Sequence, residues 1–289
     1  MQATIHTLPR VWLLSACLLH ISLCPAAAAE KTSATLLVKD SLTSPNQTAT
    51  IEARLMTKSL AAGAGLGGEP LELIVDGKVV ATAMTGGDGR GFLTYTPKTQ
   101  GVTPVQVRVG NSPRISPSDG QANLAVWERR SPILAVEMAA LFEASAQRSP
   151  LPSMGLKLQS ERKPLPDAAE ELGKLTQFYY RVVYLVTSSP GTDGFYEGTQ
   201  AREWLKTHRF PTGYVLVLPP GEQVLGTKID ELHAAGWKTV KTGIGRTKAF
   251  AEAFLQRRLD AVIVPEPAKG EAPRKARVAK TWKEIRKKL

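Results

Sequence analysis

Residues 71–83 read LELIVDGKVVATA, two short apolar runs joined by the dipeptide Asp76-Gly77. Asp-Gly between two β-prone runs is the strongest short-range signal for a β-hairpin, because a tight hairpin turn needs residues that tolerate a positive φ. The stretch therefore predicts two antiparallel strands, and it is the firmest starting point for interpreting the sequence around it.

Similar β-prone runs lie on both sides of this hairpin and are separated by turn residues. They are found at residues 35–39, 49–56, 91–96, 105–109 and 122–127. About seven short strands at this spacing are typical of a β-sandwich, and we find no convincing helical pattern among them. We therefore expect an all-β domain over residues 33–128.

The longer segment LELIVDGKVVATAMTGGDGRGFLTYTP, residues 71–97, resembles bacterial immunoglobulin-like modules. These modules often carry a DGK-VV-T hairpin followed by a Gly/Asp turn and YTP. The resemblance implies an immunoglobulin-like sandwich and says nothing of activity. Asp76 and Asp88 have the chemistry of calcium ligands, but Asp in tight turns serves local hydrogen bonds far more often, and we interpret both as turn residues.

The sequence pattern changes after residue 130. Apolar strand-like runs alternate with helical segments. The apolar runs lie at residues 133–136, 182–186, 214–218, 239–243 and 261–264. The helical segments lie at residues 166–177, 198–207, 224–235 and 247–257. Such alternation predicts a mostly parallel sheet with helices on both faces, here over residues 131–268. Ligands of these sheets bind at the carboxyl ends of the strands, so functional residues are expected directly after each strand.

The residues around these strand ends resemble the haloacid-dehalogenase-like (HAD) phosphatase superfamily, and within it the lipin-type phosphatidate phosphatase domains. The likeness covers residues 131–265 and rests on YLVTSSPG (184–191), FPTGYVLVLPPG (210–221) and LHAAGWKTVKTGIGRT (232–247). It implies an α/β Rossmann-like, three-layer domain. The expected fold class is thus two domains, an all-β immunoglobulin-like sandwich followed by an HAD-like α/β domain.

In that family, an Asp at the end of the first strand attacks phosphorus and a second Asp, two residues later, is the acid/base. The resemblance places these roles on Glu137 and Ala139. Glu is one methylene longer than Asp, which misplaces an in-line attack, and Ala139 cannot transfer a proton. The resemblance therefore implies a degenerate active site, that of a pseudo-phosphatase.

The phosphate-binding positions of the family match better. The hydroxyl that follows the second strand corresponds to Thr187 or Ser188, and the phosphate-binding lysine corresponds to Lys241, with Lys238 as the weaker candidate. The alternative interpretation is that residues 187–191 only form a strand-ending loop and that Lys241 is a solvated edge residue.

The late acidic motif, which helps to hold Mg²⁺ in the family, is replaced here. The residues after Gly245 are Arg246, Thr247 and Lys248, and none of them is a carboxylate. Mg²⁺ requires hard oxygen ligands, so we predict no cofactor unless Glu137 acts as a nucleophile, in which case Mg²⁺ is needed. The surviving set, with Gly245 and Arg246, can bind an anion but is poorly equipped to cleave it.

Residues 1–29 have the pattern of a secretory signal, with Arg10, an apolar stretch at 11–23 and small residues at 26–29. A lipoprotein signal ending at Cys24 is the alternative, although Leu23 stands where a small residue is usual. We expect a signal peptide and an exported protein, secreted to the periplasm or beyond, with no transmembrane span after signal removal. Both cysteines, Cys17 and Cys24, would leave with the signal.

The chain carries 37 Lys and Arg against 26 Asp and Glu, a net charge of +11, and nine of the basic residues lie in residues 269–289. There Val278, Trp282, Ile285 and Leu289 recur at helical spacing, which predicts a basic amphipathic helix. The helix either lies on an anionic lipid surface or docks its apolar stripe on the α/β domain. We favour docking, because four apolar residues make a narrow membrane anchor.

Together these features predict an exported, non-catalytic binding or scaffold protein whose degenerate domain binds a phosphate-bearing or other anionic ligand. Some degenerate lipin-type relatives bind phosphatidate without cleaving it, so the resemblance makes an anionic lipid headgroup the first ligand to test. The immunoglobulin-like domain is a candidate surface for a protein partner, and no nucleic acid is expected. Two alternatives stay open: an active Mg²⁺-dependent phosphatase that uses Glu137 on a phosphomonoester or phosphatidate, and a purely structural envelope protein.

Overall fold

The computed structural model describes residues 30–58, 63–143 and 162–289, and residues 31–289 form one compact unit. The predicted signal peptide, residues 1–29, lies outside the described residues. Among the described helices, none combines the length and the apolar character needed to cross a membrane.

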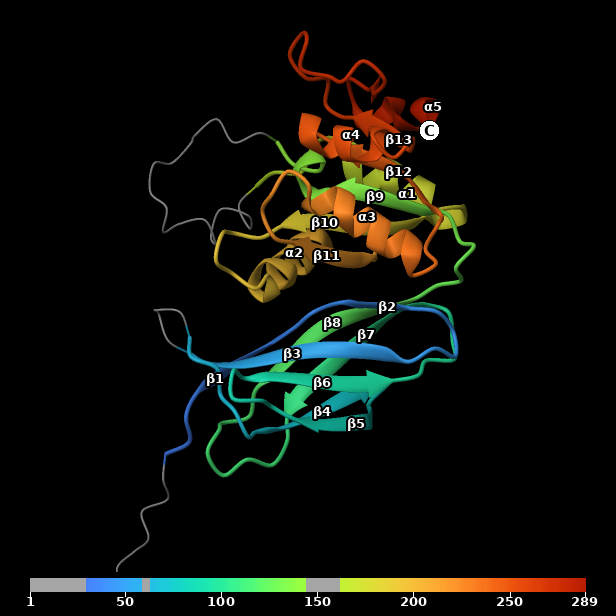
Figure 1. The fold of residues 1–289 in the computed structure, drawn as a ribbon. Helices are drawn as coiled ribbons and strands as arrows, with labels where there is room; N and C mark the ends of the chain where they lie inside the picture. The colour runs from blue at the N-terminus through green and yellow to red at the C-terminus, as the bar shows by residue number, and fades with distance from the viewer. Residues whose placement is uncertain (1–29, 59–62, 144–161) are drawn as a thin grey trace, which may run out of the picture. The chain divides into compact units, whose positions relative to one another are not determined.

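The first part of the described chain is a β-sandwich (Figure 1). One sheet is antiparallel and consists of β1 (Ala34–Val38), β3 (Ala49–Thr57) and β6 (Arg90–Tyr95), in that order. The second sheet has the order β2 (Ser41–Thr43), β8 (Asp119–Val126), β7 (Gly101–Val109), β4 (Pro70–Val75) and β5 (Lys78–Met84). This second sheet is mixed, because β2 pairs with β8 in parallel and the other pairs are antiparallel.

Alternating side chains of both sheets enclose one apolar core, in which Leu55, Leu73, Val107 and Leu124 are essentially inaccessible to solvent. The hairpin predicted at residues 71–83 is confirmed as β4 and β5. Its turn residues, Asp76 and Gly77, have φ of 49° and 75°, the left-handed region that this turn demands. The three-residue strand β2 was not predicted, because so short a segment leaves no period in the sequence.

The second part contains a parallel sheet of six strands. In sheet order they are β11 (Tyr214–Leu218), β10 (Arg181–Thr187), β9 (Ile133–Glu137), β12 (Val240–Gly245), β13 (Asp260–Ile263) and β14 (Arg277–Val278). All neighbouring pairs are parallel. The chain starts in the middle of the sheet at β9, builds one side through β10 and β11, and then builds the other side from β12 onward.

Helices cover both faces of this sheet. One face packs on α1 (Ala168–Phe178), α2 (Phe195–Thr207) and the C-terminal pair η3 (Trp282–Glu284) and α5 (Ile285–Lys288). The other face packs on α3 (Val224–Ala234) and α4 (Lys248–Leu255), and Figure 1 shows α3 on the viewer's side of the strands. A short 3₁₀ turn, η1 (Met138–Ala140), directly follows β9. The predicted β/α alternation is therefore present, with element ends shifted by a few residues.

The C-terminal segment is not the single helix that the sequence predicts over residues 269–289. Arg277 and Val278 form β14 at the edge of the sheet, and Trp282 and Ile285 are buried in the core beneath α1. The indole N–H of Trp282 donates to the carbonyl oxygen of Ala140 at 2.9 Å. The apolar residues of the segment thus pack on the α/β part, but from a strand and two short helical turns.

A buried carboxylate joins the sandwich to the α/β part. Asp40, between β1 and β2, has a side chain with no solvent exposure. Its Oδ1 accepts from the Arg202 guanidinium at 2.9 Å and from the Asn123 backbone N–H at 2.8 Å. Its Oδ2 accepts from the Val215 backbone N–H at 2.8 Å. Burial raises the pKa of Asp40 above its ordinary value, while Arg202 and the backbone donors favour the charged form.

The same contacts cover an open sheet edge. β11 is an edge strand, and unpaired edge groups need partners when they are buried. Asp40 binds the Val215 N–H, and the Asn123 side-chain amide donates to the carbonyl oxygen of Gly213 at 3.2 Å. Arg202 also donates to the carbonyl oxygens of Val38 and Gln121, at 2.9 Å each. The sandwich thus supplies the hydrogen bonds that a further strand would otherwise make.

Replacing Arg202 with Met should destabilise residues 31–289 by about 3–5 kcal/mol, because it leaves Asp40 as a buried charge without its cation. Urea unfolding at neutral pH measures the change. Arg108→Met is the matched control, since Arg108 pairs with Glu72 at the surface and such pairs contribute about 0–1 kcal/mol. Equal, small effects of both substitutions would contradict the role of the Asp40–Arg202 pair in joining the sandwich to the α/β part.

Candidate functional site

The centre of the parallel sheet is the natural place for a ligand. Strand order reverses between β9 and β12, and in open α/β sheets ligands bind at the carboxyl ends of the strands beside such a reversal. Glu137 ends β9 and Gly245 ends β12, and the residues after Gly245 lead directly into α4. The nucleophile position inferred from the sequence therefore does lie at this crevice.

The Glu137 carboxylate is bound by the chain itself. Its Oε2 accepts from the backbone N–H groups of Arg246 at 2.6 Å and Thr247 at 3.1 Å, and its Oε1 accepts from the Thr247 hydroxyl at 2.8 Å. Thr247 is also the N-cap of α4, and its oxygen accepts from the Phe250 N–H. Glu137 thus occupies the donors before a helix N-terminus, where anions are favoured.

This arrangement leaves Glu137 poorly placed for attack on phosphorus. An in-line nucleophile must present a free oxygen lone pair to the substrate, whereas both oxygens of Glu137 are turned toward β12 and α4. Two residues later, Ala139 packs against the core within η1 and has no group that can transfer a proton. These two positions thus offer neither a free carboxylate nor a proton donor, and the family roles assigned to them stay predictions.

The residues present do not fit a magnesium ion. Within the described ranges, no three His, Cys, Asp or Glu side chains gather closely enough to hold a metal. Mg²⁺ demands several oxygen ligands in near-octahedral geometry, and the Glu137 oxygens are already committed to hydrogen-bond donors.

The loop after β10 is organised by a second carboxylate, Glu197 of α2, which sequence reasoning missed. Its buried Oε1 accepts from the Ser189 N–H at 3.0 Å and from the Thr192 hydroxyl at 2.7 Å. Ser188 is buried, with its N–H bound to the Leu218 carbonyl, whereas the Thr187 side chain is exposed at the strand end. Of the two predicted hydroxyls, only Thr187 is open to solvent.

Two arginines bring positive charge to this end of the sheet. Arg246 follows β12, and Arg162 lies over the ring of Phe142 at 4.4 Å. The Nε of each is buried and has no hydrogen-bond partner among the described residues. Burial lowers the pKa of both guanidinium groups, and in Arg246 the nearby Arg162 lowers it further while Glu137 opposes the shift.

Arg162 was not among the candidates from the sequence. It reaches the site because residues 162–165 run beside the segment that follows η1, with the Glu143 N–H donating to the Lys163 carbonyl at 2.9 Å and Phe142 bridging to Pro164. This pairing joins residues twenty apart along the chain. A single Arg before a helix has no local sequence pattern that would identify it as a site residue. Arg246, by contrast, was predicted from its place after the fourth strand.

Lys241 does not belong to this site, and that prediction is wrong. Strand β12 extends to Gly245, and its pairing aligns Val240 with Ile133, the first residue of β9. Lys241 therefore lies at the amino-terminal end of the sheet, and Lys238 precedes the strand altogether. The error arose because the predicted strand ended at residue 243, so that Lys241 was placed nearer to the carboxyl end than it is.

Gly245 has a packing reason for being glycine. A Cβ at this position would lie 2.2 Å from the ring of Phe250, so α4 can approach β12 only when no side chain is present. Its carbonyl oxygen accepts from the Val264 N–H at 2.9 Å. These contacts assign Gly245 to the packing of α4, and a ligand contact stays a prediction.

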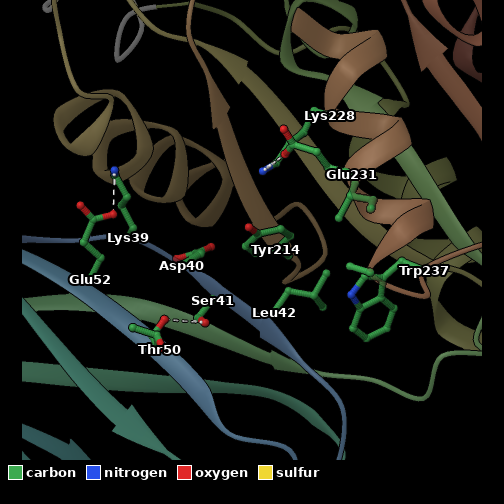
Figure 2. A pocket seen from close by; sticks show the side chains of 12 residues that line it. Lys39, Asp40, Ser41, Leu42, Thr50, Glu52, Tyr214, Lys228, Glu231 and Trp237 are labelled. Atoms are coloured by element: carbon green, nitrogen blue, oxygen red, sulfur yellow. Dashed lines mark hydrogen bonds and ion pairs between the residues drawn. The ribbon is translucent and has the colours of Figure 1, made fainter.

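A cavity of about 440 Å³ lies apart from this crevice, between the sandwich and α3 (Figure 2). Figure 2 shows Lys39 beside Glu52 on one side and Lys228 beside Glu231 on the other, and both pairs are ion pairs, at 2.9 and 2.8 Å. Because these cations are already paired, the cavity offers no net positive charge to an anion. The charge arrangement favours the crevice with Arg162 and Arg246 as the anion site.

No family model matches the chain, and no curated protein does. Among solved structures, it is similar to D,D-heptose 1,7-bisphosphate phosphatase from Burkholderia thailandensis, with 16% identity over 54% of this chain and 96% of that one and a TM-score of 0.36. It is also similar to titin domain M7 (12% identity, 34% and 98% of the chains, TM-score 0.26) and to the D0-D1 domain of intimin (13%, 32% and 49%, 0.23). Similarities at this level carry no conclusion about function.

Glu137→Ala should destabilise the protein by about 1–3 kcal/mol, because it leaves three donors at the start of α4 without their acceptor. Glu137→Gln keeps one carbonyl oxygen and should lose less. Urea unfolding of both variants, together with hydrogen exchange at the Arg246 and Thr247 amides, measures the effect. Unchanged stability and unchanged amide protection in Glu137→Ala would show that the carboxylate does not hold this turn.

Proposed function

We propose that this chain is an exported, non-catalytic binding protein in which a degenerate HAD-like phosphatase domain, preceded by an immunoglobulin-like domain, binds an anionic group at the carboxyl end of its sheet. One observation carries the proposal: the Glu137 carboxylate is held by three donors of its own chain, beside the unpaired Nε atoms of Arg246 and Arg162. The site has kept cations and lost its reactive carboxylate.

The fold supports the domain assignment in this proposal. The strand order and the helices on both faces of the parallel sheet are those expected of an HAD-like domain, and its first strand ends at Glu137. Two sheets that enclose one core are expected of an immunoglobulin-like domain. Export rests on the sequence of residues 1–29, which predicts a signal peptide.

The chemistry of the site supports binding rather than turnover. Phosphoryl transfer through a covalent intermediate needs a free carboxylate, an acid/base and charge neutralisation, and the crevice supplies only the last of these. Guanidinium groups bind phosphate and carboxylate oxygens through paired, charge-assisted hydrogen bonds. Because Arg162 and Arg246 are partly removed from water and repel each other, an anion bound by both would relieve that repulsion.

The ligand chemistry shared by the candidates is a phosphate monoester. It is present both in a soluble phosphorylated metabolite and in the headgroup of phosphatidate, and two arms of one experiment separate these sources. Inorganic phosphate and a soluble aryl phosphate probe the group itself, while phosphatidate vesicles against phosphatidylcholine vesicles probe the lipid.

The chain from residue 30 onward should release no phosphate from an aryl phosphate or from phosphatidate in the presence of Mg²⁺, because Glu137 is not free to attack. Binding of phosphate or of phosphatidate, followed by calorimetry and by sedimentation, should weaken at least tenfold in Arg246→Ala, since a charged hydrogen bond contributes about 1.5–3 kcal/mol.

Lys78→Ala is the matched control, because it removes one exposed cation of the sandwich and should leave the binding of phosphate and of phosphatidate unchanged. Turnover that disappears in Glu137→Ala would overturn the proposal in favour of an Mg²⁺-dependent phosphatase. Neither turnover nor binding in any arm would leave only the structural role in an envelope assembly.

A further inference from the structure

The amino-terminal end of the parallel sheet gathers basic side chains from separate strands. The pairing aligns Arg181 of β10 and Val240 of β12 with Ile133 of β9, and Asp260 of β13 lies opposite Thr242. Residues that start these strands, or come just before them, therefore lie along one edge. Since neighbouring strands are roughly 4.8 Å apart, the backbones at Arg181 and Lys241 are about 10 Å apart across β9.

Four exposed cations on this edge make no ion pair with any carboxylate of the described residues. These cations are Arg181, Lys238, Lys241 and Arg258. Within residues 30–58, 63–143 and 162–289, none of them forms an ion pair with a carboxylate. The neighbouring acids are already engaged, Glu128 with Arg130 and Asp260 with Arg277. Like charges at such distances repel within a Debye length, so the edge keeps an uncompensated positive field.

Two exposed aromatic side chains adjoin these cations. Phe178 ends α1 with 85% of its surface exposed, and Tyr179 follows with 65% exposed, two residues before Arg181. The Tyr179 ring meets the Tyr180 ring edge-to-face, with centroids 4.6 Å apart, and Tyr180 packs against the core. Adjacent large aromatic residues that stay in water are uncommon on a soluble surface and mark contact sites.

Local stabilisation accounts for only part of this pattern. Cations near helix C-termini are favoured by the helix dipole, which explains Arg258 after α4 and Lys238 after α3. Arg181 follows the end of α1 by three residues and is favoured in the same way, whereas Lys241 lies within β12 and gains nothing comparable. The dipole also gives no reason for Phe178 and Tyr179 to be apolar and exposed.

We propose that this amino-edge surface, formed by Phe178, Tyr179, Arg181, Lys238, Lys241 and Arg258, docks on an anionic lipid bilayer. Aromatic rings next to a row of cations match the layering of a membrane surface, in which rings enter the interface and cations remain at the charged headgroups. Each Lys or Arg close to an anionic bilayer strengthens partitioning by roughly fivefold. The charge of this surface lies on the folded sheet edge and is separate from the basic residues of 269–289.

The inference is independent of the proposed anion site, which is at the carboxyl end of the same strands. A headgroup bound by Arg162 and Arg246 needs only one phosphate, whereas docking through the amino edge needs a surface with many charges. Substitutions at one end therefore leave the other intact, and the two proposals can fail separately.

Sedimentation with vesicles tests the proposal, using the chain from residue 30 onward with vesicles of equal parts phosphatidylglycerol and phosphatidylcholine, and vesicles of phosphatidylcholine alone. The wild type should bind the anionic vesicles and not the neutral ones, and added salt should weaken binding. Arg181→Glu with Lys241→Glu should reduce partitioning by roughly 25-fold or more, since two cations are lost and two anions gained.

Lys78→Glu with Lys98→Glu is the matched control, because it changes the net charge equally at two exposed lysines of the sandwich. Phe178→Ser with Tyr179→Ser should weaken binding while salt sensitivity persists, and Phe92→Ser, which alters an exposed phenylalanine of β6, should not. Circular dichroism confirms that each variant is folded.

Equal losses in the amino-edge and control pairs would overturn the proposal, because binding would then follow net charge alone. Binding that is independent of lipid charge would overturn it as well. Duplex DNA that binds more tightly than the anionic vesicles, and is lost with Arg181→Glu and Lys241→Glu, would assign the surface to a nucleic acid instead.

Discussion

The structure depends on one buried carboxylate. Asp40 comes from the sandwich, yet it supplies the acceptors that Arg202 of α2 and the Val215 N–H of the edge strand β11 require. A buried charge is tolerated only when it is paired and hydrogen-bonded, so the sandwich, α2 and β11 must meet in one geometry for Asp40 to be satisfied. Asp193, which precedes α2, repeats this on a smaller scale by pairing with Arg54 and Arg90 of the sandwich. The two parts are therefore coupled by polar contacts as well as by apolar packing.

Carboxylates play the same role at the carboxyl end of the parallel sheet. Glu137 fills the donors before α4 and Glu197 fills those of the loop after β10. In each case a side chain of the protein occupies backbone N–H groups that, in an open site, would be free for the oxygens of a substrate. These hydrogen bonds hold the two loops in place and occupy the oxygens of Glu137. The proposed anion site therefore depends on the two nearby cations, Arg162 and Arg246.

Local sequence patterns predicted much of the fold, because hairpins and β/α alternation depend on residues that are close together in the sequence. The Asp76-Gly77 turn specifies its own backbone conformation, and strand β11 was located to the residue because it is a buried apolar run bounded by Gly and Pro. What the sequence did not reveal depends on long-range pairing. Arg162 reaches the crevice by running beside the segment after η1, and Asp40 finds Arg202 more than 160 residues away. Neither contact has a period or a spacing that a sequence window could detect.

The misplacement of Lys241 shows why residue type at a strand is weaker evidence than position along it. A parallel sheet has two chemically different ends: helix N-termini and their free N–H groups lie at the carboxyl end, and helix C-termini lie at the amino end. A shift of a few residues in the expected strand moved Lys241 from one end to the other, and so from a phosphate pocket to an exposed basic edge. The Lys241 charge then has a different expected role. At the amino edge it adds to the positive field of the surface beside Phe178 and Tyr179, and it does not bind a single anion at the carboxyl end. In the two proposals, the sheet therefore separates two kinds of anion recognition, one of a single phosphate at the carboxyl end and one of a charged layer at the amino edge.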